Sequence, residues 1–196
     1  MVSLTAEDKT FIRRKLKPLL DKTSGDWAEV RRLCVNEHMN ILCFMAEQDI
    51  DIFDGLQAIP DNFFKGMSIS HIHIPNHITT IGESAFANST LVTIEIDNGL
   101  KLIEESAFES TPLASIVLPD SVETIGKKAF YGCTDLTDVV LSDSVTILPR
   151  DTFGGCDRVT IHLNSRKGLS GARQLQIPTG EVEWYKKHTK VKGSKE

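Results

Sequence analysis

The sequence lacks the features that mark membrane, secreted and nucleotide-binding proteins. None of its 196 residues belongs to an apolar run long enough to cross a bilayer. Met1 leads into charged, amphipathic sequence, whereas a secretory signal requires an apolar core segment. No glycine-rich loop that could cradle a phosphate is present. We therefore expect a cytoplasmic protein with no membrane partner.

Cysteine is scarce, and its spacing does not suit a metal site. Four cysteines are present, and no two are spaced as in a C-x-x-C zinc motif. We expect them to be buried free thiols that act as small apolar side chains, which favours a reducing compartment. Cys133 and Cys156 fall at the same offset in successive repeats of the chain, so a disulfide between them stays open as an alternative.

Positive charge is scarce in the middle of the chain. Residues 48 to 165 hold 6 Lys and Arg against 17 Asp and Glu, whereas residues 166 to 196 hold 8 against 3. The acidic middle can serve solubility alone, or it can face a partner protein with a basic surface. Nucleic acid is not an expected partner, because one short basic tail offers few phosphate contacts and the acidic body repels the backbone.

What the sequence does contain is a repeat of 22 or 23 residues. Each unit opens with Ile or Leu and carries Phe five positions later. The opening residues are Ile59, Ile81, Ile103, Ile125 and Leu148, and the aromatic residues are Phe64, Phe86, Phe108, Phe130 and Phe153. A fixed period in this range predicts a solenoid, in which each coil buries its apolar side chains against its neighbours.

Each unit also contains two apolar residues spaced by two, which predicts a short strand with both side chains facing inwards. The pairs are Ile50 and Ile52, Ile72 and Ile74, Ile94 and Ile96, Ile116 and Leu118, Val139 and Leu141, and Ile161 and Leu163. Equal repeat length predicts that about six such strands stack in register as a parallel sheet. The stretches 83–86, 105–108 and 127–130 suit a single helical turn, with Phe filling the interior.

The repeat resembles the BspA-type (Treponema-type) leucine-rich repeat over residues 48 to 163. The resemblance rests on Ile125-Gly-Lys-Lys-Ala-Phe-Tyr-Gly-Cys-Thr-Asp-Leu and on Ile103-Glu-Glu-Ser-Ala-Phe with its following Ile116-Val-Leu-Pro. Only Cys133 and Cys156 keep the family's cysteine, and the first and last units are irregular. The resemblance implies a leucine-rich-repeat solenoid that recognises proteins and carries no catalytic residue.

The segments on either side of the solenoid are expected to cover its ends, because a terminal coil exposes apolar surface and an unpaired strand edge. Residues 1–47 predict a cap of α-helices, with Thr5 or Ser3 as a helix N-cap and a second helix from Asp26. This cap could instead bind a partner or a second copy of the chain. Residues 164–196 predict a C-terminal cap, with Val182, Trp184 and Tyr185 over the last coil, and a solvated basic tail.

The residues that flank the inward pairs must face outwards, and they form two columns along the sheet. One column is Asp49, His71, Thr93, Ser115, Asp138 and Thr160, and the other is Asp51, His73, Glu95, Val117, Val140 and His162. Neighbours in a column lie one strand apart and can interact. At the N-terminal end of the columns, carboxylates lie beside histidines. Further along, Val117 and Val140 form an apolar pair at positions that are expected to face solvent.

The resemblance implies a non-catalytic protein-binding module that needs no cofactor, and the columns indicate that it uses the strand-lined side. We expect it to be an intracellular adaptor or an inhibitor. The expected contacts are His73, Glu95, Val117, Asp138 and Val140. Two alternatives stay open. One is a cell-surface or secreted adhesin, as in relatives with this repeat. The other is a metal-dependent hydrolase that holds its ion with His71, His73 and Glu95.

Overall fold

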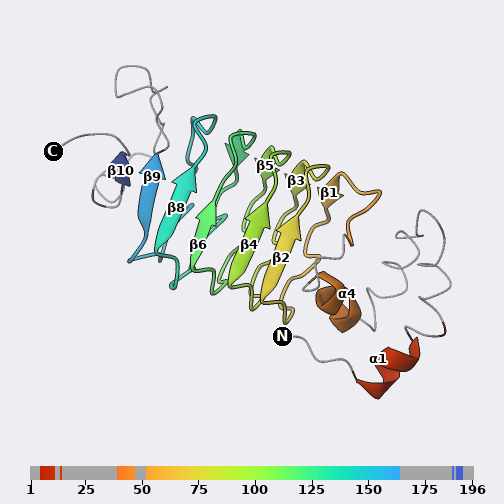
Figure 1. Cartoon of the computed structure of the whole chain (residues 1–196). Helices are drawn as coiled ribbons and strands as arrows, with labels where there is room; N and C mark the ends of the chain where they lie inside the picture. The colour runs from red at the N-terminus through yellow and green to blue at the C-terminus, as the bar shows by residue number, and fades with distance from the viewer. Residues whose placement is uncertain are drawn as a thin grey trace.

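The chain folds into stacked coils, as a computed structural model shows (Figure 1). The structure describes residues 5–11, 14, 39–46, 52–163, 187 and 189–191. One side of the stack consists of β2 (His71–Ile74), β4 (Thr93–Ile96), β6 (Ser115–Val117), β8 (Asp138–Leu141) and β9 (Thr160–Leu163). A second side consists of β1 (Ala58–Ile59), β3 (Thr80–Ile81), β5 (Leu102–Ile103) and β7 (Thr124–Ile125). Among the described residues, two helices precede them in the chain, α1 (Ala6–Phe11) and α4 (Met39–Ala46).

The strands of the first side are parallel and in register, as the repeat predicts. In one sheet, β2 pairs with β4 and Ile72 stands opposite Ile94; in the other, β6 pairs with β8, which pairs with β9. The two sheets adjoin where the amide of Ala114 donates to the carbonyl of Val92 over 3.2 Å. Equal coil length therefore places equivalent residues side by side from β2 to β9.

A column of phenylalanines runs through the interior of the stack. Phe64, Phe86, Phe108, Phe130 and Phe153 lie in order, with 5.3 Å between successive ring centroids. The rings are nearly parallel, and each is 0 or 1% exposed. The predicted solenoid core is thus confirmed, since each ring contacts its equivalents in the neighbouring coils.

The prediction of a helical turn at 83–86, 105–108 and 127–130 is wrong. Ser84, Ser106 and Lys128, two residues before a Phe, have φ angles of 54°, 56° and 56°, which a right-handed helix does not allow. Amides in this corner alternate between local turns and the next coil. Phe86, for example, donates to Ala107 over 2.8 Å. The sequence suggested helix because Glu, Ser and Ala suit one, but hydrogen bonds between coils determine the backbone here.

The second sheet was not predicted from the sequence. It consists of two-residue strands that end at the opening Ile of each repeat, and Ile59, Ile81, Ile103 and Ile125 stand in register along it. Their side chains are at most 1% exposed, whereas Thr124 and Ile147 face solvent. The interior is therefore enclosed by a sheet on two sides and by the turn corner on the third.

The two ends agree with the predictions in part. Thr5 is the N-cap of α1, since its hydroxyl accepts the amide of Asp8 over 3.1 Å and the Asp8 carboxylate accepts the amide of Thr5 over 2.8 Å. Helix α4 lies beside the first coil near β2, and its Ile41 and Leu42 are fully buried (Figure 1). The sequence predicts a second helix that begins at Asp26. The structure describes this part of the chain only from residue 39, where α4 begins.

The basic tail is not wholly solvated, which corrects the prediction. Residues Thr189–Val191 form β10, which pairs in parallel with β9 at the C-terminal end of the stack (Figure 1). This strand supplies the hydrogen bonds that the edge of β9 would otherwise leave to water. Val182, Trp184 and Tyr185 lie outside the described residues. At the opposite end Ile52 is buried and lies in a turn, and Ile50 is outside the described residues.

Candidate functional site

The outward residues of β2, β4, β6, β8 and β9 form the two expected columns, which we call the strand-lined face. His73 stands opposite Glu95, Val117 opposite Val140, and Val140 opposite His162. Val117 is 65% exposed, and Val140 is half-buried. Asp49 and Asp51, the first members of the predicted columns, lie outside the described residues. The face therefore presents an apolar centre with polar groups on either side.

Two histidines of this face contact aspartates in adjacent coils. Nε2 of His73 lies 3.1 Å from Oδ1 of Asp97, and Nε2 of His162 lies 3.0 Å from Oδ1 of Asp138. Sequence reasoning did not single out Asp97, because it follows β4 and lies outside both predicted columns. Both contacts are diagonal. Each joins a histidine to an aspartate that lies two residues from the histidine's register partner on the neighbouring strand, so the columns alone do not reveal it.

The predicted metal cluster does not form as a ligand set. His71 uses Nδ1 to contact the hydroxyl of Thr93 over 2.9 Å, whereas His73 turns towards Asp97 instead of Glu95. His77, in the adjacent turn, reaches the carbonyl of Phe53 over 3.3 Å. Among the described residues, no three His, Cys, Asp or Glu side chains are gathered where they could hold a metal ion. These contacts give the hydrolase alternative no support.

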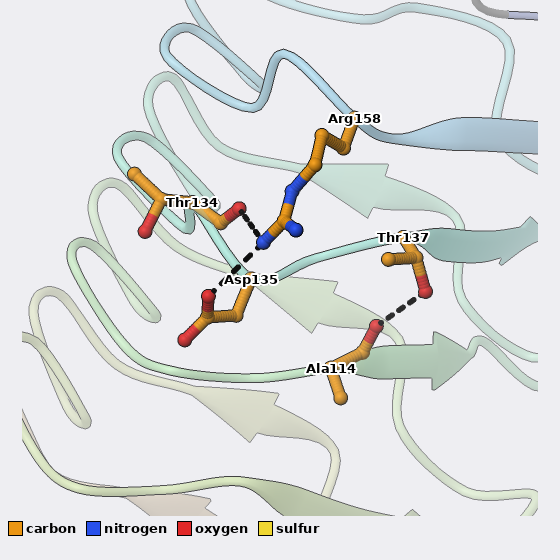
Figure 2. A network of polar contacts seen from close by, with 5 residues as sticks. All are labelled: Ala114, Thr134, Asp135, Thr137 and Arg158. Carbon is orange, nitrogen blue, oxygen red and sulfur yellow. Dashed lines mark hydrogen bonds and ion pairs between the residues drawn. The ribbon is translucent and has the colours of Figure 1, made fainter.

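Polar contacts between coils fix the edge where the strands of the face begin. Figure 2 shows Arg158 donating to the carbonyl of Thr134 and to the carboxylate of Asp135, over 3.1 and 3.2 Å. The hydroxyl of Thr137 donates to the carbonyl of Ala114 over 3.2 Å in the same view (Figure 2). Such bonds connect consecutive coils and hold the beginnings of these strands in position relative to one another.

The thiols that follow the stacked phenylalanines are structural. Cys133 and Cys156 donate to the carbonyls of Phe108 and Phe130 over 3.0 and 3.1 Å, and both are free and fully buried. Burial raises the pKa of Cys133. Burial and, to a smaller extent, the nearby Cys133 raise the pKa of Cys156 to about 12. The prediction of buried free thiols is confirmed for these two and for Cys43.

The repeat identified in the sequence and the structure also appears in a comparison with known families. The BspA type leucine rich repeat region matches residues 43–167 as six copies. The chain belongs to this family. Folds of this family are generally non-catalytic binding modules. The six copies start before β1, so the first includes the buried turn at Ile52.

Solved structures of bacterial leucine-rich-repeat proteins are similar to this chain. A leucine rich repeat protein of T. pallidum is 33% identical, with a TM-score of 0.53 over 55% of this chain and 52% of its own. A leucine rich cell surface protein of Faecalibacterium prausnitzii is 26% identical, with a TM-score of 0.56 over 63% of this chain and 34% of its own. The pneumococcal vaccine antigen PcpA, at 22% identity and a TM-score of 0.52, shares the fold over 69% of this chain and 38% of its own.

The chain thus spans 52% of the Treponema protein and 34% of the Faecalibacterium protein. A comparison with curated proteins gives no match. Within the described residues, no helix is both long enough and apolar enough to cross a bilayer.

Proposed function

We propose that this chain is a protein-binding module whose partner docks on the strand-lined face. The observation that carries the proposal is the position of Val117. This side chain is 65% exposed in the middle of the face and stands in register with Val140. Fully burying a valine contributes about 1.5–3 kcal/mol, so a partner that covers this pair gains binding free energy that solvent does not offer.

The rigidity of the face supports the same proposal. Its strands are stacked on the buried phenylalanine column, and side chains such as Arg158 and Thr137 hold neighbouring coils together. A surface that is already ordered loses little conformational entropy when a partner docks, so more of the contact energy remains as affinity. We place the contacts at His73, Glu95, Val117, Asp138 and Val140.

Two settings for this activity remain proposals. The first is an adaptor or inhibitor in the cytoplasm, which is supported by the buried free thiols. The second is an adhesin on the cell surface, which is favoured by the Faecalibacterium relative described as a cell surface protein. Brief protease treatment of intact cells separates them, because a surface protein is cleaved while a cytoplasmic one survives until the cells are lysed.

Variants at two exposed aliphatic positions test the docking surface. Val117→Asp places a charge in the strand-lined face, whereas Ile147→Asp places the same charge at a 54% exposed residue next to the other sheet. We expect both variants to keep the far-UV spectrum and melting temperature of the wild type. Pull-down from native cells should lose its partner with Val117→Asp and retain it with Ile147→Asp. Retention by both variants would contradict the proposal.

A further inference from the structure

Carboxylates adjoin the apolar centre of the strand-lined face in two coils. Glu95 lies on β4 beside Val117, and Asp97 follows the same strand. Asp138 lies on β8, two residues before Val140. The side chains of Asp97 and Asp138 are 48% and 56% exposed, so both carboxylates can meet a docked molecule.

The outward positions of β2, β4, β6, β8 and β9 contain no Lys or Arg, and their basic side chains are the histidines of β2 and β9. The exposed Lys101 and Lys127 flank β5 and β7 in the other sheet. Arg158, just before β9, is paired with Asp135 (Figure 2). Lys190 of β10 stands in register with His162 only at the C-terminal margin.

The two aspartates are held in place by histidines of neighbouring coils. His73 contacts Asp97 from β2, and His162 contacts Asp138 from β9. Each contact crosses from one coil to the next, so the carboxylates are restrained relative to Val117 and Val140. Positions fixed in this way favour a partner whose charges match them, since no side-chain ordering is needed on this side.

We propose that the partner presents an exposed peptide segment in which an apolar side chain is flanked by Lys or Arg. This inference rests on the proposed docking function and names its chemistry. The apolar side chain covers Val117 and Val140, while the cations face Glu95 and Asp97 in the coil before Val117 and Asp138 on the strand of Val140. Neighbouring strands are about 4.8 Å apart, so all these groups fall within the reach of a few consecutive residues.

A random peptide library displayed on phage, selected against the full-length chain, tests this chemistry. We expect the enriched peptides to carry Lys or Arg within two positions of an aliphatic or aromatic residue. Their binding, measured with synthetic peptides by fluorescence anisotropy, should weaken steeply as salt is raised. Enrichment of acidic or uncharged peptides would overturn the inference, and so would a lack of enrichment over uncoated support.

Three variants of the chain separate this inference from the docking function. Val117→Asn should reduce peptide binding, and Glu95→Lys should reduce it about tenfold, the equivalent of about 1.4 kcal/mol. Ile147→Asn should have no effect. If Val117→Asn weakens binding but Glu95→Lys does not, the docking face stands and the basic partner is refuted. If Val117→Asn has no effect, both proposals fail.

Discussion

The thiol of Cys133 donates a hydrogen bond over 3.0 Å to the carbonyl oxygen of Phe108 in the preceding coil. Ser89 occupies the equivalent position two coils earlier, three residues after Phe86, and its buried hydroxyl has no hydrogen-bond partner within the described part of the chain. The C–S bond is longer than the C–O bond, so sulfur extends further towards the neighbouring coil than a serine oxygen does. The comparison with Cys133 thus indicates that a cysteine suits position 89 better than a serine does.

We predict that Ser89→Cys stabilises the protein by about 1 kcal/mol, because it replaces an unsatisfied buried hydroxyl with a thiol that can reach a carbonyl. Ser89→Ala is the matched control, since it removes the hydroxyl without adding a donor, and its gain should be smaller. Urea denaturation of the three proteins measures the difference. A Ser89→Cys protein less stable than the wild type would show that the position does not follow its equivalent at Cys133.

The phenylalanine column predicts a large cost for truncating one ring. Phe108 is fully buried between Phe86 and Phe130, so Phe108→Ala should reduce the free energy of unfolding by about 3–5 kcal/mol. The control is Phe63→Ala, because Phe63 is only partly buried at the first coil and should cost less. Equal losses in urea denaturation would contradict a continuous column.

Replacing either of two glycines with alanine should destabilise the protein, for a different reason at each position. Gly66 has a φ angle of 69° with open space around it, so Gly66→Ala should cost about 1 kcal/mol through backbone strain alone. At Gly126 a Cβ would collide with the backbone of Glu104 in the preceding coil, so Gly126→Ala should cost more. Thermal unfolding compares the two. A milder effect at Gly126 would mean that the coils are not packed this closely.

The parts of the fold that follow from the length of the repeat could be predicted from the sequence. A period of 22 or 23 residues fixes which residues are equivalent, so the stacking of Phe86 on Phe108 and the register of Val117 with Val140 followed from it. The corner before each Phe did not, because hydrogen bonds to the next coil decide its backbone. The positive φ angles had a signal nonetheless, since Asn, Ser, Asp or Gly occupies most of those positions.

The predicted columns were right in their register and incomplete in their contacts. The columns placed Val117 and Val140 together, but they could not show that Val140 is half-buried while Val117 is exposed, because exposure depends on the neighbouring side chains. They also paired His73 with Glu95 by register, whereas its imidazole contacts Asp97. Diagonal contacts depend on side-chain rotamers, which a repeat alignment does not contain.

The buried thiols predict a loss of stability at alkaline pH. Burial raises the pKa of Cys156 to about 12 in the folded chain, against about 8.5 for an unfolded thiol. Between these values the unfolded state binds fewer protons, so the stability that is present below pH 8.5 is lost as the pH rises. From pH 8 to 10.5, Cys156→Ala should lose about 2 kcal/mol less than the wild type in urea denaturation. An identical pH dependence would mean that the thiol ionises in the folded state.

The central claim is that a partner protein docks over the exposed valine of the strand-lined face, and photocross-linking in the native cell tests it most directly. A benzophenone amino acid is placed at position 117 in one protein and at position 147, beside the other sheet, in a second. We predict a discrete adduct with a partner protein from position 117 and none from position 147. An adduct from position 147 alone, or equal adducts from both, would contradict the claim.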